Sequence, residues 1–491
     1  MPDWCRAQIQ FRAGIWYQLS VSEPSRPLDL LVAVSRERPA TLGAQIEGQL
    51  RRAIRDGALR AGTRLPSTRE LAGQVGVSRR ITVDAYAQLA AEGYLLLQPG
   101  ARPRVAEVGP SLGGRAPAAP TAEPAVRHDF LPSRPDVSSF PRTAWSRCLR
   151  DAVATISTDD LSYGDAIGVA QLRAALAEHL GRVRGVVADP ACVVVTNGYL
   201  QGLGLICRTL AARGARRIAL EDPSSCEEPL IAERAGLQPV RIPVDEFGLR
   251  VDLLDGADVD AVVLTPAHQH PTGVVLAPQR RAALVGWLRA RDAIAVEDDY
   301  DAEYRYDRPA VGAVQGLDPG RVVYAGTASK VLAPALRLGW LVVPAGLLHD
   351  VRQEKQLADQ GSPRVEQLAF ATFLERGDLD RHLRRMRARY RRRRDRMIDA
   401  LAAELPEAVV RGIAAGLHVT VELLPTDDEA AIRREATRRG IALSSMTDYR
   451  PAPTGLPATL ILGYSQMSED RIHAGIRELA AAVRCARGSD T

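Results

Sequence analysis

Apolar residues near the N-terminal end of the chain recur at a helical spacing. Over residues 42–54, every fourth residue is leucine or isoleucine, which predicts an amphipathic helix. Residues 67–70, Ser-Thr-Arg-Glu, have the pattern of a capping box and predict the start of a short helix. After a turn at residues 76–77, Ser78 is the expected N-cap of a second helix that ends near Gly93.

From residue 94 the pattern becomes extended. Residues 94–97 and 104–106 are mostly apolar and flank the turn sequence Gln98-Pro99-Gly100, which predicts a two-stranded hairpin. Helix, short helix, tight turn, helix and hairpin in this order predict a winged helix-turn-helix. In this fold, the second helix of the turn presents its N-terminal residues to base edges in the major groove of DNA.

The arginines of this module are candidates for DNA contacts. Arg79 and Arg80 open the second helix of the turn, where a guanidinium can bond guanine through two hydrogen bonds. Arg102 and Arg104 lie on the expected wing, where we expect contacts with phosphates or with the minor groove. The complete set of expected DNA-binding residues is Arg64, Ser67, Arg69, Ser78, Arg79, Arg80, Arg102 and Arg104. The alternative is a small helical domain with an exposed arginine face. It is less favoured because cap, turn, helix and wing agree.

Beyond residue 129, short apolar runs alternate with helical stretches. Such alternation predicts an α/β fold with a mainly parallel sheet covered on both faces and with its chemistry at the ends of the strands. The runs expected to form strands are residues 193–195, 217–220, 261–264, 293–296 and 322–324.

The region between the two patterns has the composition of a linker. Residues 109–128 contain four prolines, three glycines and five alanines, which predicts a semi-flexible spacer. The expected domains are therefore residues 36–108 and residues 129–491, and residues 1–35 are uninformative.

Composition adds a charge asymmetry to this picture. The 491 residues are 46% apolar and 25% charged, as in a soluble globular protein, and no run reaches the roughly 18 apolar residues of a membrane span. Six scattered cysteines without a Cys-x-x-Cys pair predict a reduced, cytoplasmic protein without a structural metal site. Residues 36–106 carry a net charge of +6 and the rest of the chain −1, so we expect a polyanionic partner for the N-terminal module alone.

Only two of the 64 basic residues are lysines, Lys330 and Lys355. Arginine stays charged and forms no Schiff base, whereas a lysine in a desolvated pocket can lose its proton and attack an aldehyde. Lys330 lies in Gly-Thr-Ala-Ser-Lys at residues 326–330, followed by Pro334 and Arg337. This loop is a candidate site for such chemistry, and a surface lysine is the alternative. Lys355 lies in a polar helical run and is expected on the solvated surface.

Three further polar loops follow the expected strands. Residues 196–201 place a glycine at a helix N-terminus, where backbone N–H groups can bind phosphate. Residues 265–273 contain two histidines, and residues 297–306 are rich in carboxylates and phenols. A carboxylate in such a loop can keep a pyridine nitrogen protonated, and a nearby phenol can bond a ring hydroxyl.

These four loops resemble the fold-type I aminotransferase domain, which binds pyridoxal 5′-phosphate (PLP). Residues 65–95 resemble the DNA-binding domain of GntR-type bacterial regulators, with Ile81 where that family often has threonine. The two together, over about residues 40–485, resemble the MocR-type transcriptional regulators, which include the GabR and PdxR branches. The resemblance implies a homodimeric, PLP-dependent regulator that binds double-stranded DNA.

The resemblance also implies roles for individual residues. Lys330 would form the Schiff base with PLP, Asp298 would pair with the pyridine nitrogen, and Tyr300 would bond the ring oxygen. Tyr163 would reach the phosphate bound by the neighbouring subunit. The residues expected to hold the phosphate within one subunit are Gly198, Tyr199, Thr327, Ser329 and Arg337. The alternatives are a helix cap and core packing for Asp298 and Tyr300, and simple packing for Tyr163.

Departures from the aminotransferase pattern bear on the activity. His270 stands where aminotransferases place an asparagine on the ring oxygen, and Ser225 where related regulators often place an aromatic ring on the pyridine. Glu227 stands where the GABA-responsive branch has a ligand-binding arginine, and Ile461 lies where an aminotransferase has its carboxylate-binding arginine. These differences weaken substrate positioning and favour a regulator that uses the domain for sensing.

Three hypotheses therefore stand beside one another. The favoured one is a PLP-dependent regulator without efficient turnover, whose effector is PLP itself or, less favoured, a small amine. The second is a working aminotransferase with a DNA-binding appendage. The third is a regulator that has lost PLP, which Lys330 and Asp298 argue against.

Overall fold

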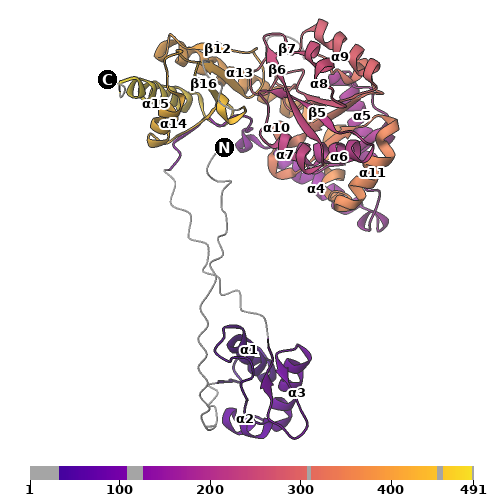
Figure 1. The fold of residues 1–491 in the computed structure, drawn as a ribbon, viewed down its shortest axis with the longest axis vertical. Coiled ribbons are helices and arrows are strands. Elements are labelled where there is room, and N and C mark those ends of the chain that lie inside the picture. Colours follow the sequence, from indigo (N-terminus) through magenta and orange to yellow (C-terminus); the bar gives the residue numbers. More distant parts are fainter. Residues whose placement is uncertain (1–31, 108–124, 307–310, 451–456, 489–491) are drawn as a thin grey trace. The chain divides into compact units, whose positions relative to one another are not determined.

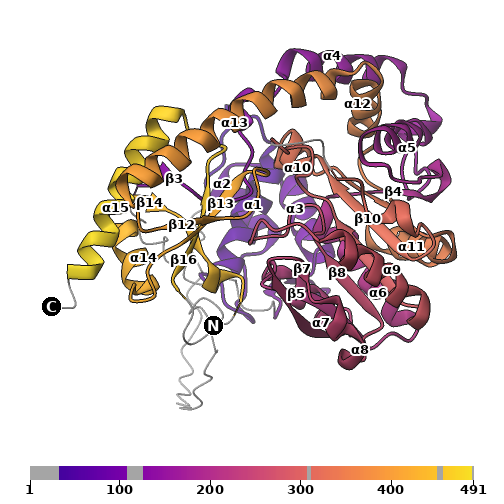
Figure 2. The same cartoon turned by 90° about the horizontal axis from the view of Figure 1, so that it is seen from above.

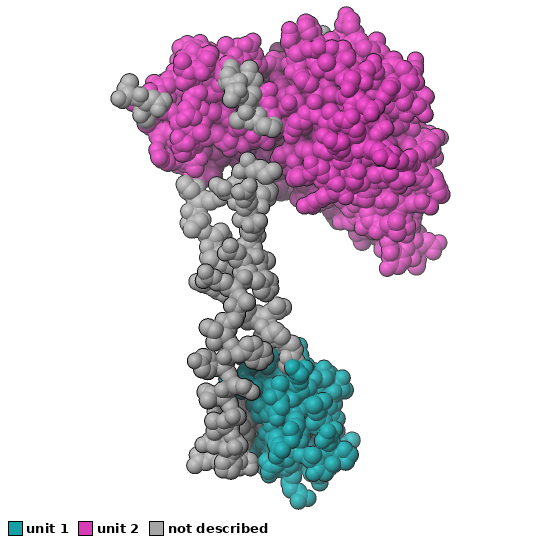
Figure 3. All heavy atoms as spheres, viewed as in Figure 1, with its two compact units in different colours: residues 1–122 teal, residues 123–491 magenta. Residues whose placement is uncertain are grey.

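The computed structural model describes residues 32–107, 125–306, 311–450 and 457–488. The chain divides into two compact units, residues 1–122 and residues 123–491 (Figure 3). Most of the expected linker, residues 109–124, lies outside the described residues. No helix in the described ranges is both long and apolar enough to cross a membrane.

The small unit is the predicted winged helix-turn-helix (Figure 1). Its elements are α1 (Leu42–Arg55), α2 (Thr68–Val75), α3 (Arg79–Ala91), β1 (Leu95–Leu96) and β2 (Arg104–Val105). The two strands pair antiparallel, as the hairpin prediction requires. The periodic residues Ile46 and Leu50 of α1 are fully buried and pack with Leu71, Tyr86 and Leu89 of the other two helices.

The two predicted helix caps of this unit differ. Ser67 Oγ accepts a hydrogen bond from the Glu70 N–H at 3.2 Å, and the Ser67 N–H donates to Glu70 Oε2 at 2.7 Å, so the capping box is confirmed. Ser78 occupies the N-cap position of α3, but its side chain makes no capping hydrogen bond. The predicted N-cap position is therefore confirmed, but without a contribution from the hydroxyl. The Thr82 hydroxyl instead donates to the Thr68 carbonyl at 2.8 Å and ties α3 to α2.

Both units extend slightly beyond the boundaries expected from sequence. Gln49 of α1 exchanges hydrogen bonds with the backbone of Ala33, so the small unit begins before residue 36. In the large unit, the Arg127 N–H donates to the Gly440 carbonyl at 2.7 Å. Strand β3 (His128–Asp129) then pairs in parallel with β14 (Ile441–Ala442). Residues 127–128, which we assigned to the linker, are therefore part of the large unit.

The large unit is built on an eight-stranded sheet in the order β4-β11-β10-β9-β8-β5-β6-β7. The strands are β4 (Val193–Thr196), β5 (Arg217–Asp222), β6 (Gln238–Asp245), β7 (Gly248–Leu249), β8 (Ala261–Leu264), β9 (Ile294–Asp298), β10 (Val322–Thr327) and β11 (Gly339–Val342). The five predicted strands are confirmed, and β6, β8, β5, β9 and β10 run parallel. Strand β11 was not predicted. It runs antiparallel between β4 and β10.

Helices cover both faces of this sheet, as predicted. On one face, strand residues such as Val194 and Val323 share a core with α6 (Tyr199–Ala212), α7 (Glu227–Arg234) and α11 (Ala345–Asp359). On the other face, Val262 and Ala295 share a core with α8 (Leu254–Ala257) and α9 (Pro278–Arg291). The alternation of neighbouring residues between the two cores is that of a sheet buried on both sides.

The remaining helices surround the sheet and a second, smaller sheet. The helices are α4 (Arg142–Thr155), α5 (Ala170–Arg184), α10 (Ala328–Val331), α12 (Arg364–Glu375), α13 (Asp378–Glu404), α14 (Glu429–Arg438) and α15 (Glu469–Gly488). The smaller sheet has the order β12-β13-β16-β15, with β12 (Val409–Arg411), β13 (His418–Glu422), β15 (Ser444–Ser445) and β16 (Thr459–Gly463). Figure 2 shows the long helix α13 running from α12 to the side of α15.

Candidate functional site

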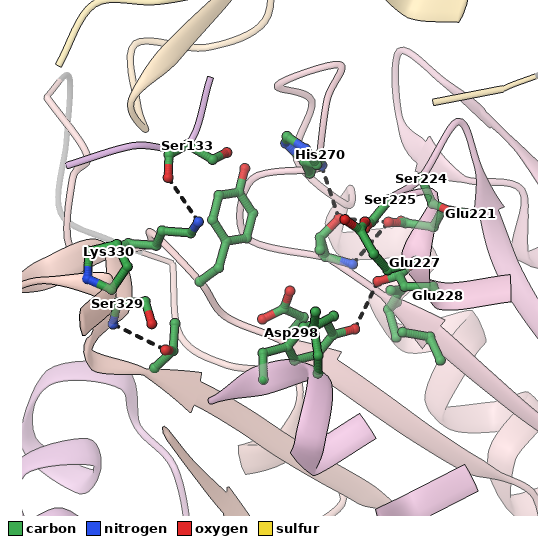
Figure 4. Close-up of a pocket in the computed structure, with 18 of the residues that line it drawn as sticks. Ser133, Glu221, Ser224, Ser225, Glu227, Glu228, His270, Asp298, Ser329 and Lys330 are labelled. Atoms are coloured by element: carbon green, nitrogen blue, oxygen red, sulfur yellow. Dashed lines mark hydrogen bonds between the residues drawn. The ribbon is translucent and has the colours of Figure 1, made fainter. Parts of the chain in front are cut away.

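A cavity of about 290 Å³ lies at the carboxyl ends of the central strands. It is lined by loops that follow β4, β5, β8, β9 and β10 (Figure 4). Of the predicted cofactor-binding residues, those lining it are Tyr199, His270, Asp298, Tyr300, Thr327, Ser329, Lys330 and Arg337. Residues that are far apart in the sequence therefore meet where parallel strands end.

Lys330 reaches into this cavity from the short helix α10. Its Nζ donates a hydrogen bond to the Ser133 carbonyl at 2.8 Å (Figure 4). Burial lowers the pKa of this ammonium group, although Asp298, Asp301 and Glu227 act in the opposite direction. A lowered pKa increases the fraction of neutral amine, which is the nucleophilic form.

Asp298 is the acidic residue of its loop that faces the cavity. The neighbouring carboxylates are engaged inside the protein: Asp299 forms a buried ion pair with Arg184 at 2.7 Å, and Asp301 lies 3.0 Å from His268 Nδ1. Asp298 Oδ1 is buried and has no hydrogen-bond partner among the described residues. Burial, followed by the charges of Glu228 and Asp299, raises the pKa of Asp298 well above its usual range. A bound cationic N–H donor would satisfy this oxygen and stabilise its charge.

Of the residues predicted to hold a phosphate, Tyr199, Thr327, Ser329 and Arg337 line the cavity, and Gly198 adjoins Arg337 without lining it. We call this group the phosphate end of the pocket. Gly198 is the N-cap of α6 with φ of 98°, and a Cβ there would lie 2.7 Å from Arg337 Nη2. The Arg337 guanidinium donates to the Asn197 carbonyl, and the Ser329 N–H donates to Thr327 Oγ1 at 3.1 Å. A guanidinium, hydroxyl groups and a helix N-terminus therefore converge here, as anion binding requires.

The two residues predicted near the ring oxygen have buried polar surroundings. Burial, with the charge of Lys330 next, lowers the pKa of His270 to about 3, so its imidazole is neutral at physiological pH. The Tyr300 hydroxyl lies 3.1 Å from His268 Nδ1, and burial raises its pKa. Both side chains line the cavity, and the Tyr300 hydroxyl already has a partner within the protein.

Tyr163 does not line this cavity. Its side chain is 88% exposed and lines a second cavity of about 400 Å³ together with residues 359–365. The structure of one chain therefore places Tyr163 outside the pocket to which Lys330 belongs. Contact of Tyr163 with the phosphate bound by a neighbouring subunit therefore stays a prediction.

Several pocket residues were missed by sequence reasoning. The Ser133 carbonyl bonds Lys330, and no sequence signal marks Ser133. Glu221 accepts from the Thr265 hydroxyl at 2.6 Å, and Glu228 accepts from the Tyr199 hydroxyl at 2.8 Å. Burial raises the pKa of both carboxyl groups to about 7. The position of Glu221 at the end of β5, after an apolar run, was a usable signal.

The prediction that Lys355 is a surface residue was wrong. Its side chain is fully buried and forms an ion pair with Asp359 at 2.6 Å. Of its polar neighbours in the sequence, Arg352, Gln353 and Gln356 are exposed and Glu354 is half-buried. Lys355 follows the buried Leu347 and Val351 at a spacing of four residues, so helical periodicity was a usable signal that its polar neighbours obscured.

The predicted DNA-binding residues of the small unit are mostly free at its surface. Arg64, Arg69, Arg79 and Arg104 are exposed, and Arg80 is 91% exposed with Asp84 3.8 Å away. Arg102 instead pairs with Glu70 at 2.7 Å, and the Ser67 hydroxyl is used in the capping box. A DNA contact by either of these two would compete with a bond inside the unit.

Comparisons with known proteins find relatives of both the small unit and the large unit. Residues 42–105 match the gntR family of bacterial regulatory proteins, and residues 138–461 match aminotransferase class I and II. The HTH-type pyridoxine biosynthesis transcriptional regulator PdxR of Corynebacterium glutamicum is 32% identical, over 93% of this chain and 99% of its own. The probable rhizopine catabolism regulatory protein MocR of Rhizobium meliloti is 30% identical, over 92% and 96%. The chain belongs to the MocR-type transcriptional regulators.

Solved structures resemble the large unit of this MocR-type regulator. Pyrococcus horikoshii kynurenine aminotransferase, in a complex that contains PMP, is 26% identical with a TM-score of 0.67, over 74% of this chain and 91% of its own. LysN of Thermus thermophilus, complexed with N-(5′-phosphopyridoxyl)-L-leucine, is 25% identical with a TM-score of 0.66, over 74% and 93%. The large unit thus has the aminotransferase fold, whose cofactor is PLP.

The residues of the pocket fit PLP. The orphaned Asp298 Oδ1 suits a protonated pyridine nitrogen, and Lys330 offers an amine with a lowered pKa. The absence of a side chain at Gly198 lets the Arg337 guanidinium lie directly against the start of α6, which brings the two anion-binding groups together. When bound, PLP supplies an aldehyde that binds the lysine amine covalently and a ring that withdraws electrons.

Proposed function

We propose that this regulator senses PLP itself through the pocket around Lys330, and that its affinity for DNA responds. The observation that carries the proposal is that Lys330 and Asp298 line one cavity, and that the buried Asp298 Oδ1 has no hydrogen-bond partner among the described residues. Arg337 is the sole guanidinium among the described residues that line it. One anion-binding group is sufficient for the phosphate of PLP. An amino-acid substrate would need a second such group for its carboxylate.

Turnover is expected to be slow or absent. Reaction at an amino acid needs a lysine that moves a proton, a protonated ring nitrogen, and a substrate whose Cα–H bond is held in line. Lys330 and Asp298 provide the first two. Ile461 is fully buried in β16, opposite Thr420 of β13, and does not line the cavity, so no charge there binds a carboxylate. Ser225 provides no ring to stack on the cofactor.

A carboxylate-bearing effector is disfavoured by charge. Glu227 lies at the cavity, accepts a hydrogen bond from the Ser225 hydroxyl and interacts with Lys330. Hydrogen bonds from Ser225 and its own backbone lower the pKa of Glu227 despite burial, so it is an anion at physiological pH. It repels a second carboxylate, which places a GABA-like amine behind PLP as effector.

For the assembly, we propose a homodimer in the cytoplasm that binds a two-part operator through Arg79, Arg80 and the wing. Tyr163 then completes the phosphate site of the neighbouring subunit. Its exposure supports this role, as does that of Leu161, which is 68% exposed two residues before it.

The deciding experiment compares DNA binding with and without PLP. A duplex selected by the intact protein from a random pool is titrated with the full-length chain and with a fragment ending at about residue 108. We expect PLP to shift the affinity of the full-length chain and not that of the fragment. An unchanged affinity of the full-length protein would refute the sensing role.

A parallel assay addresses the enzyme hypothesis. Common amino donors are mixed with the PLP-loaded protein, and formation of the keto acid is followed. Turnover at the roughly 1–10³ per second of ordinary enzymes would establish the working aminotransferase instead.

A further inference from the structure

Lys355 is a fully buried cation close to the phosphate end of the pocket. Its Nζ donates to Asp359 Oδ2 at 2.6 Å and to Ser362 Oγ at 3.0 Å, and lies 3.4 Å from Gln201 Oε1. Three acceptors match the three N–H donors of an ammonium group. An ion held inside a protein in this way is costly unless its partners are complete.

Nearly all other cationic side chains of this protein are arginines. The lysine at position 355 can be explained by the shape of the ammonium group. A guanidinium is larger and planar, with five donors in a rigid fork, whereas three acceptors surround the ammonium group at this position. Lys330 is retained for its reactivity, whereas Lys355 is retained for its compactness.

The partner of Lys355 connects it to the start of α6. Asp359 Oδ2 also accepts hydrogen bonds from Asn197 Nδ2 at 2.9 Å and from Gln201 Nε2 at 2.7 Å. Gln201 in turn accepts from the Asn197 N–H at 2.7 Å. These two residues lie on either side of Gly198 and Tyr199, the residues that open α6.

The same segment contacts the guanidinium of the phosphate end. The Asn197 carbonyl accepts from Arg337, and the Cα of Gly198 lies so close to Gly339 of β11 that a Cβ there would come within 2.8 Å. The peptide between β4 and α6 is thus held on one side by Arg337 and β11, and on the other by Asp359.

We propose that Lys355 is a positioning residue for the phosphate of the cofactor. It fixes Asp359, which holds Asn197 and Gln201, so that the first turn of α6 and Arg337 present their donors to one point. Anion binding by several donors requires placement to within about 0.5 Å. Loss of the ammonium group leaves Asp359 without its counter-ion and releases the segment that carries Gly198.

The test separates phosphate recognition from general stability. PLP and pyridoxal share the aldehyde and the ring, and pyridoxal lacks the phosphate. We compare the dissociation constants of both for the full-length wild-type chain and for Lys355→Met. The proposal expects the preference for PLP over pyridoxal to fall by about tenfold or more, the loss known for outer-shell partners of metal ligands, with little change in pyridoxal binding.

Two further variants support the assay. Gln201→Ala removes one arm of the network without stranding a charge, and it is expected to lower the same preference if Lys355→Met does not fold. Arg213→Met is the matched control. Arg213 joins α6 to α11 through Asp350 at 3.3 Å, at the other end of α6, and its loss is expected to leave the preference unchanged.

The possible outcomes distinguish this inference from the proposed function on which it rests. Equal weakening of PLP and pyridoxal in Lys355→Met, or an equal loss of preference in Arg213→Met, would show that Lys355 only stabilises the packing of the two helices. A wild-type chain that binds neither compound would refute the PLP site itself.

Discussion

The two units of this regulator present their functional side chains in opposite ways. In the small unit, Arg79 and Arg80 are exposed at the start of α3, and the capping box of the preceding helix α2 is local in sequence. In the large unit, Lys330, Asp298 and His270 come from three strand ends, and their pKa values are shifted chiefly by burial. The first surface acts through charge in water, and the second acts through groups removed from water.

This difference sets the size of mutational effects. An exposed arginine contributes one or two hydrogen bonds to DNA and leaves the fold intact when it is lost. A buried titratable group is coupled to its neighbours, so that its loss alters chemistry, stability and pH dependence together.

The largest effect is expected at Lys330. Lys330→Ala removes the only lysine of the cavity and should abolish the visible absorbance band of the covalently bound cofactor. Borohydride reduction of the wild-type chain followed by peptide mapping should place the label on Lys330. A label on Lys355, the other lysine of the chain, would contradict the assignment and the contrast between the two buried lysines.

Glu228→Gln tests whether the buried acids behave differently from exposed ones. Burial raises the folded-state pKa of Glu228 from 4.5 to about 7, so the native state binds this proton more tightly than the unfolded chain. The stability contribution is fully present below about pH 4.5 and is lost as the pH rises through 7.

The glutamine side chain of the variant does not titrate, so the variant does not lose stability as the pH rises through 7. Its free energy of unfolding relative to the wild type should therefore rise by about 3 kcal/mol between pH 4 and pH 8, as measured by denaturant titration at each pH. Glu233→Gln, at an exposed position of the same helix α7, is the control. If the free energies of unfolding of Glu228→Gln and the wild type changed with pH in the same way, ionisation of Glu228 would not destabilise the folded state.

Arg79→Ala measures the exposed side of the comparison. Loss of a bidentate base contact should weaken binding to the selected duplex by about 1–3 kcal/mol and leave the cofactor absorbance unchanged. Arg52→Ala, an exposed arginine of α1 outside the predicted contact set, should have a smaller effect. Equal weakening on random DNA would show that Arg79 contacts phosphates only.

The smallest effect is expected at the two serine caps. Ser67→Ala should cost the small unit about 1 kcal/mol of stability, because its hydroxyl caps α2. Ser78→Ala should cost only a few tenths of that, because its side chain makes no capping bond. Thermal unfolding of the small-unit fragment compares them. An equal loss in both variants would contradict the difference between the caps.

Much of the fold followed from local patterns in the sequence. Residues within a few positions of one another form the capping box, the hairpin and the five apolar runs that were predicted as strands. The structure has all of them at the predicted places. The loops that carry Lys330 and Asp298 could be expected to meet because parallel strands end at one edge, whereas the roles of the two residues were implied by the resemblance to the aminotransferase domain. The insertion of β11 between β4 and β10 was not predictable, because strand order depends on pairing between distant segments.

What the sequence by itself determined is which residues occupy each face of each helix and the end of each strand, since these follow from periodicity. Only the tertiary structure decided which polar residues are buried and with what partners. Lys355 lies in a run whose neighbours are solvated, and its burial depends on Asn197 and Gln201, more than 150 positions away in the chain. Ser133 reaches Lys330 across 197 positions. The energy of a buried charge depends on the whole shell of groups around it, and that shell exists only after distant segments have packed.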